Sequence, residues 1–356
     1  MSEAVVDDIV ALLPPLLQTL EGLGFVARYL HPPDYAEVMR LAGQPDDALR
    51  AELPRLTTWP DDFAHLRGPL QAAGAQALAG FSGLRAVDAG EGDLTDVFRA
   101  LRHLPQALEA LYPLSGMPPI SRFFLDPALA DDASLAALLE RPRHPDSGVF
   151  HDANELDSRG GYSFYVPEYY TPDRAWPLVM ALHGGSGHGR LFLWSWLRDA
   201  RSRGAIVVAP TAVGRTWSLT GEDADTPNLA RILDLVRSHW TIDASQMLLT
   251  GLSDGGTFCY VSGLDSTSPF THLAPVAASF HPMIASIADP ARLRGLPIQI
   301  VHGAHDWMFP VELARQAQQA LTAAGADVTY REIADLSHTY PREINATLLA
   351  WMRPAA

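Results

Sequence analysis

The fold is decided by the stretch Met247-Leu-Leu-Thr-Gly251-Leu-Ser253-Asp-Gly255-Gly256, in which an apolar run ends in Gly-x-Ser-x-Gly. This pattern is typical of a buried strand, a strained turn that carries a serine, and a helix that starts directly after it. Strand and helix nearly touch at such a turn, so the residues two positions before and after the serine must be small, as Gly251 and Gly255 are. A pattern this short also occurs by chance, so the rest of the chain must supply a base, an acid and an oxyanion hole in the right order.

Composition limits the class of protein. The 356 residues are 47% hydrophobic and 19% charged, which favours a globular chain of two domains over a disordered one. The formal net charge of −15 argues against nucleic acid and anionic membrane surfaces as partners. The sequence contains no lysine, which excludes a Schiff-base lysine, pyridoxal-phosphate chemistry and a P-loop. Its sole cysteine, Cys259, excludes an internal disulfide and a cysteine-rich metal site, so we expect no metal and no cofactor.

The N-terminal residues lack a basic region followed by an uninterrupted apolar core, and we see no apolar run of roughly 18 residues that could span a bilayer. We therefore expect a cytoplasmic protein without stable membrane insertion. Residues 1–145 show the apolar spacing of short helices, with Pro14-Pro15 expected to interrupt the first helix and Pro105 to kink or break a later one. This helical domain carries no concentration of catalytic groups. Its role stays unassigned, although it could mediate homo-oligomerisation.

A linker at Arg141–Gly148 separates this domain from residues 146–356, in which the pattern changes. Short apolar runs that suit buried strands alternate there with helical patterns at 229–239, 311–323 and 342–352. This alternation predicts an α/β fold: a mostly parallel sheet with helices on both faces. The expected strands are 161–166, 176–182, 205–209, 247–250, 273–278, 298–301 and 328–332.

Catalytic groups are expected on loops beyond the carboxyl ends of these strands. A serine hydroxyl is a weak nucleophile, so it needs a histidine as base and a carboxylate to hold that histidine in one tautomer. Asp306 follows the strand at 298–301 and His338 follows the last strand, which gives the order Ser253, Asp306, His338. All three at strand ends, in this order, indicate a catalytic triad more strongly than any one of them alone.

Other residues compete for these roles. Asp335 is a poorer acid, because it lies on the same loop as His338. His281 follows the wrong strand for the base but could line the substrate pocket. We expect His302 to end a strand, packed in place, and His305 to be structural.

The oxyanion hole requires two backbone N–H groups about 3 Å from the developing alkoxide. One should belong to Asp254, at the start of the helix that follows the serine. The other should come from the glycine-rich loop Leu182-His-Gly-Gly-Ser-Gly187, where we favour Gly185, with Ser186 or Gly184 as alternatives. A phosphate-binding glycine loop is disfavoured, because the chain offers no partner lysine.

The motifs together resemble the α/β-hydrolase superfamily. Residues from about 160 to the C-terminus are similar to phospholipase/carboxylesterases and to polyhydroxybutyrate-depolymerase-like esterases. The resemblance rests on Leu-His-Gly-Gly-Ser-Gly at 182–187, Gly-Leu-Ser-Asp-Gly-Gly at 251–256, His-Gly-Ala-His-Asp at 302–306 and Ser-His-Thr-Tyr-Pro at 337–341. Such relatives often carry a tryptophan at the place of Trp217. The helical domain has no counterpart in the small esterases.

The resemblance implies a metal-independent serine esterase that acts on a small-molecule ester. The aromatic residues Trp194, Trp196, Trp217, Trp307 and Phe309 are consistent with an apolar acyl or aryl pocket, and Ser186, Trp217, His281 and Trp307 are its possible lining. A thioesterase or a peptidase could use the same triad. From a different class, the chain could be an interaction protein whose helical domain is the working part and whose hydrolase is a scaffold.

Overall fold

The computed structural model describes residues 3–353, and the chain forms two compact units, Met1–Ala130 and Asp131–Ala356. The sequence placed this division near residue 145, at the stretch rich in proline and arginine. The short helix α8 (Ala133–Leu139) accounts for the difference, because it groups with the second unit. The carboxylate of Asp132 caps this helix and accepts a hydrogen bond from the N–H of Leu135 at 2.8 Å.

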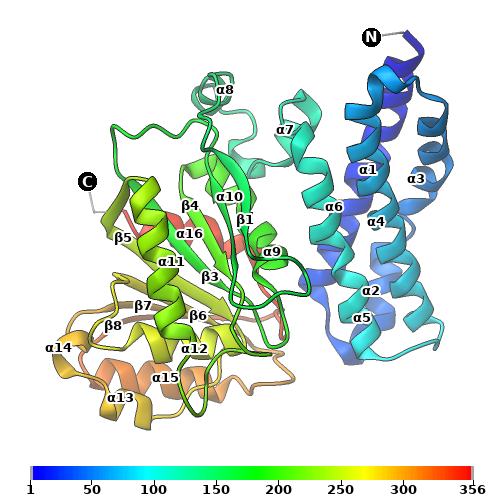
Figure 1. Cartoon of the computed structure of the whole chain (residues 1–356). Helices are drawn as coiled ribbons and strands as arrows, with labels where there is room; N and C mark the ends of the chain where they lie inside the picture. Colours follow the sequence, from blue (N-terminus) through cyan, green and yellow to red (C-terminus); the bar gives the residue numbers. More distant parts are fainter. Residues whose placement is uncertain (1–2, 354–356) are drawn as a thin grey trace. The chain divides into compact units, whose positions relative to one another are not determined.

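The first unit is a bundle of helices (Figure 1). Its long helix α1 contacts α2, α3, α4 and α6, and buries a stripe of leucines that includes Leu12, Leu16, Leu20 and Leu23. Spacings of three and four residues place such a stripe on one helical face. The helices are α1 (Glu3–Tyr29), α2 (Tyr35–Ala42), α3 (Asp46–Glu52), α4 (Ala64–Asp88), α5 (Leu94–Leu101), α6 (His103–Leu111) and α7 (Pro118–Phe123).

The expected interruption at Pro14-Pro15 is wrong, since α1 runs through both prolines. Each proline removes one backbone hydrogen bond, but the leucines before and after the pair are buried, and tertiary packing keeps the helix continuous. The break near Pro105 is confirmed: α5 ends at Leu101 and α6 begins at His103, so the proline lies in the first turn of the later helix.

Helix α1 also differs from the sequence expectation in a second respect. It is long and apolar enough, by length and composition, to cross a membrane, with a mean hydropathy of 1.6 over its most apolar window. Half of that window is buried inside the helical bundle. Core helices of bundles, signal sequences and membrane spans share this length and composition.

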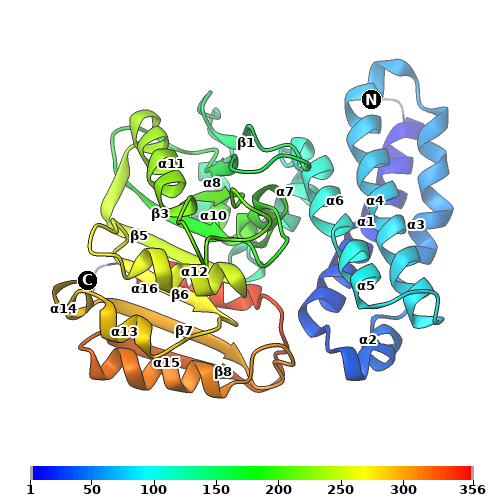
Figure 2. The same ribbon diagram turned by 60° about the horizontal axis from the view of Figure 1, so that its bottom comes forward.

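The second unit is built on an eight-stranded sheet in the order β1-β2-β4-β3-β5-β6-β7-β8 (Figures 1 and 2). β2 pairs antiparallel with β1 and β4, and the other neighbours pair in parallel. This confirms the mostly parallel α/β sheet predicted from the sequence. The strands are β1 (Gly148–Asp152), β2 (Tyr162–Val166), β3 (Trp176–Leu182), β4 (Ile206–Pro210), β5 (Ile242–Leu252), β6 (His272–Val276), β7 (Pro297–Gly303) and β8 (Asp327–Ile333).

Helices cover both faces of this sheet, with α11, α12 and α15 on one face and α10 and α16 on the other (Figure 1). α12 starts directly after β5, and α16 follows the loop after β8. The helices not yet placed are α9 (Gly189–Phe192), α10 (Leu197–Arg203), α11 (Asp225–His239), α12 (Asp254–Gly263), α13 (Met283–Ile287), α14 (Pro290–Leu293), α15 (Glu312–Ala323) and α16 (Asn345–Trp351).

The edge strand β1 was not predicted from the sequence, because its residues lie next to the linker and show weak alternation. Its place in the sheet comes from cross-strand contacts with β2, where Phe150 stacks on Phe164 with ring centroids 5.0 Å apart.

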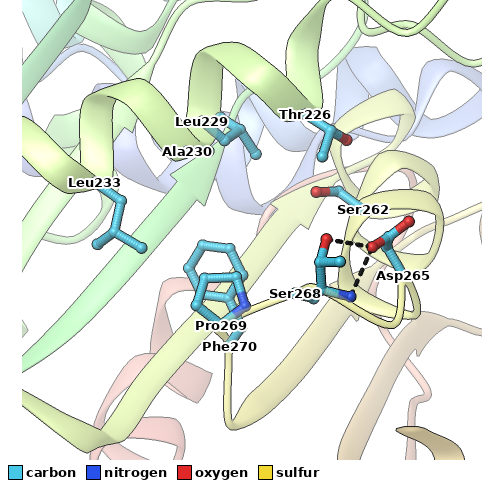
Figure 3. A pocket seen from close by; sticks show the side chains of 10 residues that line it. Thr226, Leu229, Ala230, Leu233, Ser262, Asp265, Ser268, Pro269 and Phe270 are labelled. Carbon is cyan, nitrogen blue, oxygen red and sulfur yellow. Dashed lines mark hydrogen bonds between the residues drawn. The ribbon is translucent and has the colours of Figure 1, made fainter.

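A small cavity lies between α11 and the segment that follows α12 (Figure 3). Its volume is about 60 Å³, and Leu229 and Leu233 of α11 face Phe270 across it. A larger groove of about 380 Å³ lies between α12 and α13 and is lined by Tyr260, Leu264 and Ile287, among others. Neither is lined by Ser253, Asp306 or His338.

Candidate active site

Ser253 occupies the turn between β5 and α12, with φ 57° and ψ −119°. Positive φ is strained for any residue other than glycine and persists only where the surroundings enforce it. The strand and the helix approach so closely here that only glycine fits. A Cβ at Gly251 would lie 2.5 Å from the backbone of Gly255, and a Cβ at Gly255 would lie 2.5 Å from the carbonyl oxygen of His183. The turn therefore has the strained form that the Gly-x-Ser-x-Gly pattern predicted.

A chain of hydrogen bonds links three loops at the carboxyl ends of β5, β7 and β8. The Nε2 atom of His338 lies 2.9 Å from the Oγ atom of Ser253. Its Nδ1 atom lies 2.9 Å and 2.8 Å from the two carboxylate oxygens of Asp306. With Nδ1–H donated to the carboxylate, Nε2 can accept the serine proton. The structure thus brings together the three residues that the sequence singled out.

The carboxylate of Asp306 is fully enclosed, with 0% of its side chain exposed. Burial by itself raises the pKa of Asp306, but hydrogen bonds from His302 and His338 outweigh it and hold this pKa well below its usual range. The backbone N–H groups of Met308 and Phe309 add hydrogen bonds at 2.9 Å and 2.8 Å. Asp306 is therefore ionised and fixed in orientation.

His302 is a second histidine on the same carboxylate. Its Nε2 atom lies 3.2 Å from Oδ2 of Asp306 and 2.8 Å from the carbonyl oxygen of Phe309. Both of these atoms are acceptors, so Nε2 carries the proton. Its Nδ1 atom is buried and has no partner among residues 3–353, which suits the lone pair of a neutral ring better than a second N–H. The sequence predicted a packed strand end for His302 and did not anticipate this contact.

The glycine loop after β3 is shaped by His183. The N–H of Ala212 donates to its Nε2 at 3.1 Å, and its Nδ1 lies 2.7 Å from the carbonyl oxygen of Gly184. Burial lowers the pKa of His183 to about 3, so the ring is neutral with the proton on Nδ1. The loop and α12 meet closely, because a Cβ at Gly185 would lie 2.6 Å from Oδ2 of Asp254. The two residues predicted to form the oxyanion hole are therefore neighbours.

The predicted lining residues fall in different environments. Trp307 is 40% exposed, and its ring centroid lies 6.3 Å from that of His338. Trp217 is only 2% exposed, and its Nε1 donates to the carbonyl oxygen of His183 at 2.7 Å. It is therefore a buried residue that contacts the start of the glycine loop. Ser186 lies on that loop, and the exposed His281 follows β6.

Part of the second unit is similar to a known protein family. Residues 222–350 match the model of the phospholipase/carboxylesterase family. A curated relative, the bifunctional acetylxylan esterase/xylanase of Neocallimastix patriciarum, is 27% identical over 194 residues, which cover 52% of this chain and 27% of that protein. The chain thus spans only about a quarter of the length of the relative it matches.

The solved structures that align with this chain include the following two. A thermostable esterase aligns with a TM-score of 0.44 and 20% identity, covering 57% of this chain and 58% of that chain. A ferulic acid esterase aligns with a TM-score of 0.47 and 18% identity, covering 57% of this chain and 95% of that chain.

The second unit therefore has a mostly parallel α/β sheet, and part of it is similar to the phospholipase/carboxylesterase family. Within residues 3–353 the structure has no group of three or more His, Cys, Asp and Glu side chains placed to hold a metal ion. Cys259 is fully buried behind the turn, and burial raises the pKa of its thiol, so it is inert.

Three residues around this candidate site could not be found from the sequence. Thr216 donates to Oδ2 of Asp254 at 2.6 Å, Arg215 contacts Ser186, and Arg159 contacts Gly187. None of them belongs to a motif, and their partners lie 28 to 38 positions away in the chain. His302 did carry a signal, since it lies four residues before Asp306 at the end of a strand.

Proposed function

We propose that this protein is a serine hydrolase that cleaves carboxylic esters through an acyl-enzyme intermediate. The observation that carries the proposal is the hydrogen-bonded chain from Asp306 through His338 to Ser253, with the serine held at positive φ. A serine hydroxyl that donates to an imidazole, which in turn donates to a buried carboxylate, is the arrangement that general-base activation requires.

The proposed reaction has two halves. Oγ of Ser253 attacks the ester carbonyl carbon while its proton passes to Nε2 of His338, which forms a tetrahedral oxyanion. Collapse of this intermediate breaks the bond to the alcohol oxygen, and the imidazolium returns its proton to the leaving alcohol. A water molecule then attacks the acyl-enzyme with the same histidine as base, and the carboxylic acid leaves Ser253 free.

Three further groups are proposed to stabilise the reaction. Asp306 holds His338 in the tautomer that accepts the serine proton, and its charge stabilises the imidazolium. The backbone N–H groups of Gly185 and Asp254 are proposed to bind the oxyanion, supported by their proximity and by the position of Asp254 at the start of α12.

The test compares Ser253→Ala with Ser286→Ala, an exposed serine on α13 that lies outside the proposed machinery. Hydrolysis of p-nitrophenyl acetate and labelling by a fluorophosphonate should both disappear in Ser253→Ala and persist in Ser286→Ala. Full activity of folded Ser253→Ala would overturn the proposal.

The leaving group needs a separate comparison. Acetyl esters are the starting series, because the curated relative is named an acetylxylan esterase. Rates on an ester, a thioester and an amide of one acyl group, followed by longer acyl chains, would separate an esterase from a thioesterase or a peptidase. Faster turnover of the thioester or amide than of the ester would replace the ester assignment.

A further inference from the structure

Three consecutive residues, Arg215, Thr216 and Trp217, each contact a residue in or next to the proposed oxyanion hole. We call residues 214–217 the bracing segment. Nε of Arg215 donates to Oγ of Ser186 at 3.2 Å, Oγ1 of Thr216 donates to Asp254 at 2.6 Å, and Nε1 of Trp217 donates to the carbonyl oxygen of His183 at 2.7 Å. This segment follows β4, so it links the loop after β3 to the start of α12.

The loop at 184–187 that it contacts is strained. Ser186 has φ 54°, in the left-handed region that favours glycine. The N–H of Gly187 donates to the carbonyl oxygen of Gly184 at 2.9 Å, which closes a tight turn around Ser186. A turn with a serine in this conformation has lower-energy alternatives and keeps its shape only if its surroundings hold it.

Arg159, in the connection between β1 and β2, contacts the strained loop. Its guanidinium donates to three carbonyl oxygens: Nη1 to Gly187 at 2.7 Å, Nε to Gly214 at 2.8 Å and Nη2 to Arg215 at 3.1 Å. The first oxygen belongs to the strained loop and the other two to the bracing segment. One rigid planar group therefore ties the two together.

The geometry of this contact is unusual for an arginine. The guanidinium forms no ion pair with a carboxylate in the described part of the chain, and its donors go to backbone oxygens in two loops. Burial lowers the pKa of Arg159 more than the nearby charge of Asp225 raises it, so burying the cation costs free energy. The hydrogen bonds to the three backbone oxygens offset part of this cost.

We propose that Arg159 is a positioning residue of the oxyanion hole, which fixes the 184–187 loop by fastening it to the bracing segment. This inference rests on the proposed function. The N–H of Gly185 is two residues from the oxygen that Arg159 holds. A donor must lie within a few tenths of an ångström of its place at the oxyanion, so release of the loop weakens the transition state more than it weakens substrate binding.

The decisive variants are Arg159→Lys and Arg159→Gln. Lysine keeps the charge but has a single ammonium group. This group cannot reach all three backbone oxygens that surround the planar guanidinium of Arg159. We expect kcat to fall by roughly 10- to 100-fold in both variants, with KM within about threefold of the parent value. Arg231→Gln is the matched control, because Arg231 contacts the neighbouring carbonyl of Gly160 on the same connection but no residue of the 184–187 loop.

A second readout separates positioning from a general loss of structure. An alkyl trifluoromethyl ketone forms a tetrahedral adduct with the serine and should lose affinity in parallel with kcat, whereas the product carboxylic acid should bind almost unchanged. Methylguanidinium added to Arg159→Ala should restore part of kcat. If Arg159 variants do not fold, Arg215→Gln removes the exposed contact with Ser186 and should lower kcat, by a smaller factor, at constant KM.

The outcomes separate this inference from the proposed function. If Ser253→Ala is inactive while Arg159→Lys and Arg215→Gln keep the parent kcat and ketone affinity, the positioning role is wrong and the esterase assignment stands. If KM rises while kcat and ketone affinity stay constant, Arg159 acts on substrate binding and the inference also fails. Full activity of Ser253→Ala would remove the basis of both.

Discussion

The imidazole of His302 lies 3.2 Å from the carboxylate of Asp306, four residues further along the chain, and both side chains are almost completely buried. This histidine shares the carboxylate with His338, so two rings and two backbone N–H groups converge on one side chain. The end of β7 and the loop after it therefore orient Asp306 together with His338.

Replacing His302 should reduce catalysis without touching the reacting atoms. His302→Leu removes one hydrogen bond to an ionised group, worth about 1.5 kcal/mol, so we expect kcat to fall roughly tenfold. His302→Gln keeps an N–H at a similar reach and should lose less. Steady-state kinetics on a p-nitrophenyl ester would measure both. Equal losses in the two variants would argue that packing, and not the hydrogen bond, is what His302 contributes.

We expect Asp306 to stabilise the folded chain at neutral pH and to lose this contribution in acid. Its pKa is below the usual range in the folded state, so its contribution is fully present above the unfolded value of about 3.9 and is lost as the pH falls below it. The difference in unfolding free energy between the parent chain and Asp306→Asn should be constant above about pH 5 and shrink toward pH 3. Urea unfolding across this range would measure it. A difference that stays constant or grows as the pH falls would contradict the prediction.

The same substitution should nearly abolish activity at neutral pH. Asp306→Asn keeps the shape of the side chain but presents an amide to Nδ1 of His338, which favours the wrong tautomer, and the expected loss in kcat is about 10⁴-fold. A loss below about tenfold would argue that Asp306 does not orient the base.

Some parts of the site could be predicted from the sequence, because a short stretch of residues determines them. Others depend on segments that are far apart in the chain. Ser253, Asp306 and His338 could be predicted, because each follows an apolar run that forms a strand, and parallel strands end at one edge of the sheet. The contacts of Arg159 could not, since they join residues 28 to 56 positions apart in loops without a pattern. The continuity of α1 through Pro14-Pro15 was mispredicted for a related reason: the packing that overrides the proline preference is tertiary.

A buried ion pair outside the site should be more important for stability than its surface counterparts. Glu168 and Arg201 are each 2% exposed and lie 3.0 Å apart, and the hydroxyl of Tyr165 also donates to Glu168 at 2.8 Å. Arg201→Met leaves a carboxylate buried without this guanidinium and should cost about 3–5 kcal/mol. The double variant Glu168→Leu/Arg201→Met removes both charges and should recover a large part of that loss. Chemical denaturation would measure the unfolding free energies of both variants. A double variant less stable than Arg201→Met would contradict the prediction.

The close approach at the serine turn gives the sharpest stability prediction. In Gly251→Ala the new Cβ would lie 2.5 Å from the backbone of Gly255, which no side-chain rotation can relieve. The strand and α12 must separate, so we expect a loss of about 1–3 kcal/mol and a displaced Ser253. Gly68→Ala is the control: its Cβ meets nothing within 4 Å on α4, and alanine is the better helix former there. Thermal unfolding should show destabilisation in the first variant only, together with lost fluorophosphonate labelling. Unchanged labelling in folded Gly251→Ala would mean that the strand and α12 can separate without moving Ser253.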